Sequence, residues 1–93
     1  MRFEWDENKN RANQRKHQIS FGEAKTVFYD ENARLIMDPD HSGDEERFII
    51  MGLSVRLRML VVVHCYKEND EVIRIISARK ANQSERKNYN RRR

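Results

Sequence analysis

The sequence predicts an α+β fold: a twisted, mainly antiparallel sheet with two amino-terminal helices packed on it and a helix at the carboxyl end. Three observations lead to this prediction. Helix-start signals occur twice in the first 25 residues, apolar runs rich in Val, Ile and Leu follow between residues 33 and 78, and a polar stretch with helical spacing ends the chain. A chain of 93 residues has room for a single domain, residues 1–93, with a thin core.

The first segment is expected to form a short strand and a surface helix. Residues 2–5 show the alternation of a strand, and Asp6 is suited to cap a polar helix that runs to about His17. That helix has only a narrow apolar seam, spaced by sevens: Trp5, Ala12 and Ile19. We therefore expect it to lie on the surface and to bury little apolar area.

A second helix is signalled more strongly. Ser20 and Glu23 have the spacing of a capping box, in which the serine hydroxyl accepts from the third amide and the glutamate reaches back to the serine amide. Apolar residues then follow at helical spacing: Phe21, Ala24 and Phe28. This stripe predicts a helix that faces the core.

Four strands are expected next, over residues 33–37, 47–53, 57–66 and 71–78. Pro39 ends the first of them because proline cannot donate to a strand ladder, and residues 67–70 have a length suited to a hairpin loop. The last two strands consist mostly of Val, Ile and Leu, which predicts that they lie in the centre of the sheet.

The last of these strands is expected to carry side chains out of the core. By alternation, one face holds Val72, Arg74, Ile76 and Ala78, and the other holds Ile73, Ile75, Ser77 and Arg79. The second set begins apolar and ends polar, so we expect Ser77 and Arg79 to reach an open surface. A polar helix over residues 80–90 should follow, with three residues on one face: Ala81, Glu85 and Tyr89.

The charge of the chain is unevenly distributed. The formal net charge is +4, and residues 79–93 hold seven cations against one anion, whereas residues 38–46 are acidic. This asymmetry favours a polyanionic partner at the basic end; solubility alone is the alternative. The tail from Asn90 to Arg93 is open to either reading, since it can bind RNA or remain solvated.

Composition also indicates the cellular compartment of the protein and whether a metal site or cofactor is expected. Cys65 is the one cysteine and lies in an apolar run, which is typical of a small core residue. Without a signal peptide or a run of 18 apolar residues, we expect a cytoplasmic protein with no membrane contact. The three histidines are far apart, and no ligand spacing is present, so no metal site or cofactor is expected.

Five segments stand in the order and at the spacing of one known family: residues 3–9, 16–24, 27–30, 44–48 with 52–54, and 74–81 with Glu85, Arg86 and Tyr89. In these segments the chain resembles toxins of the BrnT type. The resemblance implies a RelE-like fold and a ribonuclease toxin of a type II toxin–antitoxin system, which cleaves RNA and inhibits translation and growth. It also implies a cognate BrnA-like antitoxin that neutralises the toxin, and a toxin–antitoxin complex that binds operator DNA.

Two other functions remain open at this point. The chain can be a non-catalytic basic module that binds nucleic acid or the ribosome and acts as corepressor with a partner protein. It can also be an interaction subunit whose apolar sheet edge accepts a partner strand or helix. Whether RNA cleavage would need the ribosome is not indicated by the residues.

A ribonuclease without a metal ion needs few protein groups, because the RNA supplies its own 2′-hydroxyl nucleophile. The protein must accept a proton, stabilise the phosphorane and help to protonate the leaving oxygen. We expect Arg79 and Arg86 to bind the phosphate, because a guanidinium stays charged and matches phosphate oxygens. We expect Glu85 to accept a proton or orient an arginine, and Tyr89 to stack on a base or donate a hydrogen bond. His17 is a candidate general base; the alternative is a cation at a helix end, where the helix dipole favours it.

Further residues are expected to bind RNA: Lys16, Arg47, Arg58, Ser77 and Lys80. Structural roles stand beside these functional ones. Glu85 and Tyr89 have the spacing of a packing pair on a helix, and Arg86 can be a solvated cation. Arg74 is expected to form a structural ion pair, and His64 to be a hydrogen-bonded core histidine.

Overall fold

The computed structural model describes residues 1–38 and 46–91. The acidic loop predicted between residues 39 and 45, including His41, and the tail residues Arg92 and Arg93 lie outside this part of the chain. The elements are β1 (Arg2–Glu4), α1 (Glu7–His17), α2 (Phe21–Ala24), the 3₁₀ helix η1 (Lys25–Tyr29), β2 (Arg34–Met37), β3 (Phe48–Leu53), β4 (Met59–Lys67), β5 (Val72–Lys80) and α3 (Gln83–Arg91).

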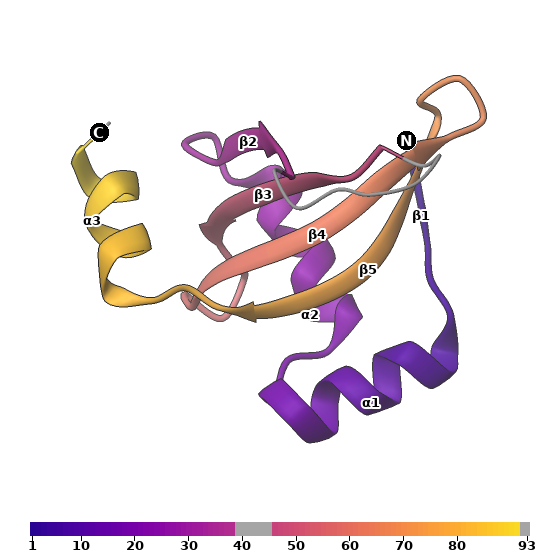
Figure 1. Ribbon diagram of the computed structural model, residues 1–93, viewed down its shortest axis with the longest axis horizontal. Coiled ribbons are helices and arrows are strands. Elements are labelled where there is room, and N and C mark those ends of the chain that lie inside the picture. The colour runs from indigo at the N-terminus through magenta and orange to yellow at the C-terminus, as the bar shows by residue number, and fades with distance from the viewer. Residues whose placement is uncertain (39–45, 92–93) are drawn as a thin grey trace.

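The strands form one five-stranded sheet in the order β1-β5-β4-β3-β2. Only the β1–β5 pair is parallel, and the other three pairs are antiparallel. The sheet is therefore mainly antiparallel, and the predicted α+β class is confirmed. Strands β4 and β5 are inner strands, as their Val and Ile content predicted (Figure 1).

One face of the sheet is covered by α1, α2 and η1. Phe21, Ala24 and Val27 are fully buried there and pack against Ile50, Leu60 and other strand residues. Phe21 and Ala24 thus confirm the predicted core-facing stripe, whereas Phe28, its third residue, is partly buried and lies in η1, and the fully buried Val27 was not predicted. The hydroxyl of Ser20 accepts from the Glu23 amide at 3.0 Å, as predicted, but the Glu23 carboxylate makes different contacts, described below.

The opposite face carries α3, which is joined to β5 by a short connection (Figure 1). A smaller core cluster lies beneath it: Met51, Val61, Ala81 and Tyr89. The helix begins at Gln83 instead of Lys80, because β5 continues to pair with β4 as far as Leu60 and Lys80. The polar run after Ala78 thus belongs partly to the strand.

The buried face of α1 is polar. Asn10 and Asn13 are its buried residues, and Ala12 is exposed, so the predicted apolar seam does not exist. The Asn13 amide group donates to the carbonyls of Ile19 and Ala78 at 2.9 and 2.8 Å and accepts from the Ala78 amide at 3.1 Å. Hydrogen bonds from asparagine therefore fix α1 to β5. The predicted cap is present, with Asp6 accepting from the first helical amides.

A β-bulge interrupts β5. Val63 pairs with Ser77 and His64 pairs with Ile75, so Ile76 is an extra residue in β5. Because side chains alternate along a strand, the extra residue reverses the face that each later side chain occupies.

The bulge corrects the predicted faces of β5. Ile73 and Ile75 pack with Ala78 in the core beneath α1 and α2, whereas Arg79 lies on the face that α3 covers. The prediction that all four residues of the second set share a face is therefore wrong. Ser77 and Arg79 do share one, because both follow the bulge.

None of the helices in residues 1–38 and 46–91 combines the length and the apolar character needed to cross a bilayer.

Candidate active site

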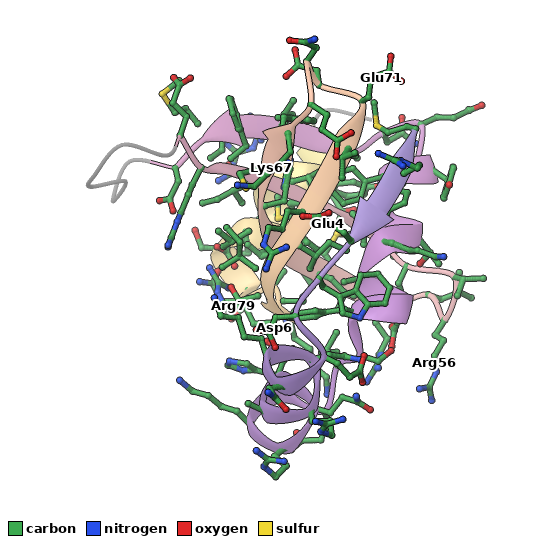
Figure 2. The ribbon with its side chains drawn as sticks, turned by 90° about the vertical axis from the view of Figure 1, so that its right-hand side faces the viewer. Glu4, Asp6, Arg56, Lys67, Glu71 and Arg79 are labelled. Carbon is green, nitrogen blue, oxygen red and sulfur yellow. The ribbon has the colours of Figure 1, made fainter. Side chains whose placement is uncertain are left out.

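The end of β5 presents cations on both faces of the sheet. Arg79 pairs with Val61 on the α3 side, and Lys80 pairs with Leu60 on the side of α1 and α2. Arg79 and Lys80 are both exposed. In the side view of Figure 2, Arg79 and the turn residue Arg56 project to opposite sides of the molecule.

Arg79 forms a bidentate ion pair with Glu85. Its Nη1 and Nη2 atoms donate to the two carboxylate oxygens, each at 2.9 Å, and Nη1 also donates to the Lys80 carbonyl at 3.3 Å. The hydrogen bond from Arg79 is the main cause that lowers the pKa of Glu85, and the same contact raises the pKa of Arg79. With side chains 44% and 28% exposed, both groups are charged at neutral pH and reachable from solvent.

The Glu85 carboxylate is also held by the start of α3. The Asn82 amide donates to Glu85 Oε1 at 2.8 Å, and the Glu85 amide donates to the Asn82 side chain at 2.8 Å. This is a reciprocal capping box. Asn82 and Glu85 have the capping-box spacing in the sequence, but that signal was hidden because the helix was expected to start at Lys80.

Two more predicted residues lie beside the pair. Arg86 is exposed, and its Nη1 atom donates to the Ala81 carbonyl at 2.9 Å. Ser77 is half-buried and lies on the same face as Arg79, about 7 Å back along the strand. The structure therefore brings together Ser77, Arg79, Glu85 and Arg86.

Tyr89 does not belong to this group. Its side chain is 1% exposed, and its hydroxyl donates to Asp30 Oδ2 at 2.6 Å. The same oxygen accepts from the Leu53 amide at 2.8 Å, and it lies 2.8 Å from where a Cβ on Gly52 would stand. Tyr89 therefore anchors α3, and in this structure it is not available to stack on a base.

His17 and Lys16 lie at the carboxyl end of α1, near the end of β5. Asn13 is bonded to Ala78, and His17 follows Asn13 by one turn, about 6 Å along the helix. Lys16 is exposed and His17 is half-buried. They are on the Lys80 side of the sheet, not on the Arg79 side.

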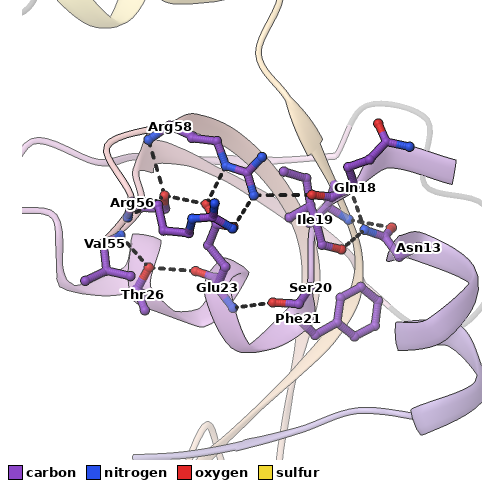
Figure 3. Close-up of polar contacts among 12 residues, drawn as sticks. Asn13, Gln18, Ile19, Ser20, Phe21, Glu23, Thr26, Val55, Arg56 and Arg58 are labelled. Carbon is purple, nitrogen blue, oxygen red and sulfur yellow. Dashed lines mark hydrogen bonds and ion pairs between the residues drawn. The ribbon is translucent and has the colours of Figure 1, made fainter. Parts of the chain in front are cut away.

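Arg58 belongs to a buried polar network centred on Glu23 (Figure 3). It donates from Nε to Glu23 Oε2 at 2.9 Å, from Nη2 to Glu23 Oε1, and from Nη2 to the Gln18 carbonyl at 3.2 Å. The Ser54 hydroxyl adds a bond of 2.7 Å to the carboxylate, whose side chain is 5% exposed. The hydrogen bond from Arg58 is the largest cause that lowers the pKa of Glu23.

This network was missed by sequence reasoning. Glu23 was assigned to its own helix cap, whereas its carboxylate fixes the turn between β3 and β4 to α2. No local pattern relates Glu23 to Arg58, which is 35 residues away. Arg58 is thereby committed to a buried carboxylate, and a contact with RNA would have to use its remaining exposed surface.

Arg47 is not brought to this end of the molecule. It directly precedes β3, and its carbonyl accepts from the Asp38 amide at 2.9 Å, next to the Met37–Phe48 pair. Arg79, by contrast, is level with Met51 through Val61. Four residues of extended chain, about 13 Å, separate the two rows.

The predicted structural residues are confirmed. Arg74 donates to Glu4 at 2.7 Å in an ion pair between β5 and β1. His64 is fully buried, with Nδ1 at 3.2 Å from the Val62 carbonyl, and burial lowers its pKa. Within the described residues, no three ligand-type side chains gather as they would around a metal ion.

Comparison with known families matches residues 5–85 to the family described as the ribonuclease toxin, BrnT, of type II toxin–antitoxin systems. Among solved structures, the chain is similar to the Brucella abortus ribonuclease toxin BrnT, with a TM-score of 0.67 and 24% identity. The match covers 89% of this chain and 99% of that one and shows the same fold. No curated protein sequence matches the chain.

Proposed function

The chain belongs to the BrnT family of ribonuclease toxins of type II toxin–antitoxin systems, and from this premise we propose that it cleaves RNA without a metal ion and binds the scissile phosphate through Arg79. The observation that carries this proposal is the bidentate pair of Arg79 with Glu85 at the exposed end of β5. A guanidinium held in a fixed plane at a solvent-facing strand end is suited to recognise a phosphate.

The donors left on Arg79 support this role. A guanidinium has five N–H groups, and the contacts with Glu85 and the Lys80 carbonyl use three of them. Among residues 1–38 and 46–91, the Nε–H and one Nη2–H therefore have no acceptor, and they form the side-on fork of the group. This fork matches two oxygens of one phosphate without breaking the pair with Glu85.

In the proposed reaction, the 2′-oxygen of RNA attacks the adjacent phosphorus and the bond to the 5′-oxygen breaks. A base takes the 2′-hydroxyl proton, and the leaving oxygen receives a proton, so the products are a 2′,3′-cyclic phosphate and a 5′-hydroxyl. Arg79 stabilises the charge that develops on the phosphorane. Arg86, Lys80, Lys16 and Ser77 would bind neighbouring phosphates.

Glu85 acts in this proposal as a positioning residue, not as the base. Its contacts with Arg79 lower its pKa, which makes the carboxylate a weaker proton acceptor. The predicted base, His17, lies on the Lys80 side of the sheet, opposite Arg79. Because the attacking 2′-oxygen and the phosphorus belong to one ribose–phosphate unit, the base for this step must lie on the Arg79 side, and His17 is assigned to the binding of a neighbouring nucleotide. A strand of RNA would have to pass around this end to meet both faces.

At the level of the cell, cleavage of RNA in the cytoplasm would inhibit translation and growth until the antitoxin neutralises the toxin. Membership of a toxin–antitoxin family implies an antitoxin partner. Operator binding by the toxin–antitoxin complex and any dependence on the ribosome remain part of the proposal.

Mapping of RNA ends tests the proposed function. Wild-type protein incubated with RNA in the presence of a chelator should give 2′,3′-cyclic phosphate ends. Arg79→Ala should reduce the cleavage rate about 100- to 1000-fold, because it removes a donor to the transition state. Arg2→Ala is the matched control and should retain the wild-type rate. Arg2 is an exposed cation with a Glu68 partner, and it lies beside Val72 at the opposite end of β5 from Arg79.

Three results separate the alternatives. Salt-sensitive RNA binding without new ends would establish the non-catalytic module instead. If Arg79→Ala lowers the melting temperature so far that the protein is unfolded at the assay temperature, the loss of activity would mean that Arg79 is structural. Glu85→Gln should lower the rate and keep the shape of the pH–rate profile, whereas a lost acidic limb would identify Glu85 as the base.

A further inference from the structure

The two edges of the sheet differ in their protection. On β1, Arg2 and Glu4 carry charges that pair with Glu68 and Arg74, which is typical of an edge that resists further strand pairing. On β2, three consecutive apolar residues are exposed: Leu35 at 51%, Ile36 at 51% and Met37 at 55%. An apolar edge of this kind is a template for another chain.

The backbone of β2 is correctly set for such pairing. The Asp38 amide donates to the Arg47 carbonyl, and the register continues with Ile36 opposite Ile49. In an antiparallel ladder, alternate residues point their backbone groups at the partner strand. Leu35 and Met37 therefore direct their N–H and C=O groups away from β3, toward the outer edge.

A groove of about 190 Å³ adjoins this edge on the α3 side of the sheet. Its floor is apolar, and its rim is polar: Ile36, Ile49, Met51 and Val61 form the floor, and Arg34, Glu85 and Asn88 form the rim. The groove shares Ile36 with the exposed edge and Glu85 with the candidate active site.

Arg34 gives the groove a charge preference. Its Nη1 atom donates to the Asn88 carbonyl at 3.3 Å, while its Nε atom has no hydrogen-bond partner within the described residues. A buried donor without an acceptor is costly, and an incoming carboxylate would relieve it with a small movement of the side chain. The net charge of +4 favours an acidic partner in the same way.

We propose that the outer edge of β2 and this groove are the docking surface for the antitoxin, which adds an extended segment beside β2 and sets an acidic side chain next to Arg34. This inference rests on the proposed function, because it takes its partner from the toxin–antitoxin family. A segment in the groove reaches Glu85, so it stands beside Arg79 and keeps RNA from the fork. Neutralisation then follows from direct competition at one end of the groove.

A protein segment fits this surface better than RNA does. The groove floor is aliphatic and sulfur-containing and offers no aromatic ring on which a base could stack. The outward-facing N–H and C=O groups of Leu35 and Met37, which no strand of the described residues pairs with, match the repeat of a peptide backbone.

Amide hydrogen exchange tests the location. The probe is the purified antitoxin encoded beside the toxin gene, added to the full-length toxin. The Leu35 and Met37 amides should exchange at least about tenfold more slowly in the complex, because they gain backbone partners. The amides of β1, at the opposite edge, should be unchanged. The proposal is overturned if the antitoxin leaves these two amides unprotected, if toxin alone protects them as its concentration rises, or if an RNA oligomer protects them to the same degree.

Substitutions at Ile36 test the chemistry of the partner. Ile36→Lys should weaken antitoxin binding about tenfold, and Ile36→Glu should weaken it further, because the second change also repels an acidic segment. Leu57→Glu, at an exposed leucine in the β3–β4 turn, is the control and should bind as wild type. Equal affinity of all three variants would refute the inference.

RNA cleavage in the same samples separates this inference from the proposed function. Both Ile36 variants should still cleave RNA and should resist the antitoxin. Antitoxin binding that depends on Ile36 in a protein without ribonuclease activity would leave the docking surface standing and defeat the catalytic proposal.

Discussion

Two asparagines hold α1 against the sheet by hydrogen bonds, whereas most surface helices are held there by buried apolar side chains. Asn10 accepts from the Phe21 amide at 2.9 Å, and Asn13 satisfies both backbone groups of Ala78. Hydropathy periodicity cannot reveal such a face, because the buried residues are polar and Ala12, on the expected seam, is exposed. The position of the helix was predictable from Asp6, but the reason it stays on the sheet was not.

Asn13→Ala should therefore destabilise the protein far more than its polarity indicates. The change leaves the Ala78 amide and two buried carbonyls without partners, which we expect to cost about 2–4 kcal/mol of unfolding free energy. Urea denaturation followed by circular dichroism measures this. Lys9→Ala, at an exposed position of the same helix, should stay within about 0.5 kcal/mol of wild type. A small effect of Asn13→Ala would show that water replaces the lost bonds.

Among the elements, α3 depends most on contacts from outside itself. It is nine residues long and strongly charged, and its only buried residue is Tyr89. The strands were predictable because Val and Ile runs mark them directly. The start of α3 was not, since it depends on how far β5 continues to pair with β4 beyond Ala78. The same holds for the candidate site. Arg79 and Glu85 were identified as site residues from the sequence, but their ion pair could not be predicted because it depends on the turn at Ala81 and Asn82.

Tyr89→Phe tests how α3 is anchored. The substitution keeps the ring in its pocket and removes the hydrogen bond to Asp30, so we expect a loss of about 1–2 kcal/mol in unfolding free energy. Amides in α3 should exchange faster than those of β4, because the helix can then detach locally. Unchanged exchange in α3 would mean that packing alone holds the helix and that the hydroxyl is dispensable.

At the scale of the whole molecule, a highly charged shell surrounds a core that contains ionisable groups. His64 lies among Phe28, Phe48 and Tyr66, and burial lowers its pKa. Glu23 and Glu85 have pKa values lowered by arginine partners. All three groups bind protons less readily in the folded than in the unfolded chain, so acid favours unfolding through each of them.

The loss of stability with acid should occur in two stages. As pH falls below about 6.5, the unfolded chain takes up a proton at the position of His64 that the folded chain refuses. Below about pH 4.5, protonation at Glu23 and Glu85 adds a second decline. Urea unfolding at a series of pH values measures this. His64→Gln should remove the first stage and retain the second, and an unchanged profile in that variant would contradict the assignment.

The bulge at Ile76 has a consequence for how this protein can vary. A shift of register that paired Ile76 directly with Val63 would remove the bulge and turn every later side chain of β5 to the other face of the sheet. The guanidinium of Arg79 would then point into the hydrophobic core beneath α1 and α2, and the methyl group of Ala78 would lie on the side of α3. Deleting Ile76 would also restore strict alternation, but it would leave Arg79 opposite Val61 on the side of α3, so the face of Arg79 is set by the register of β5 against β4.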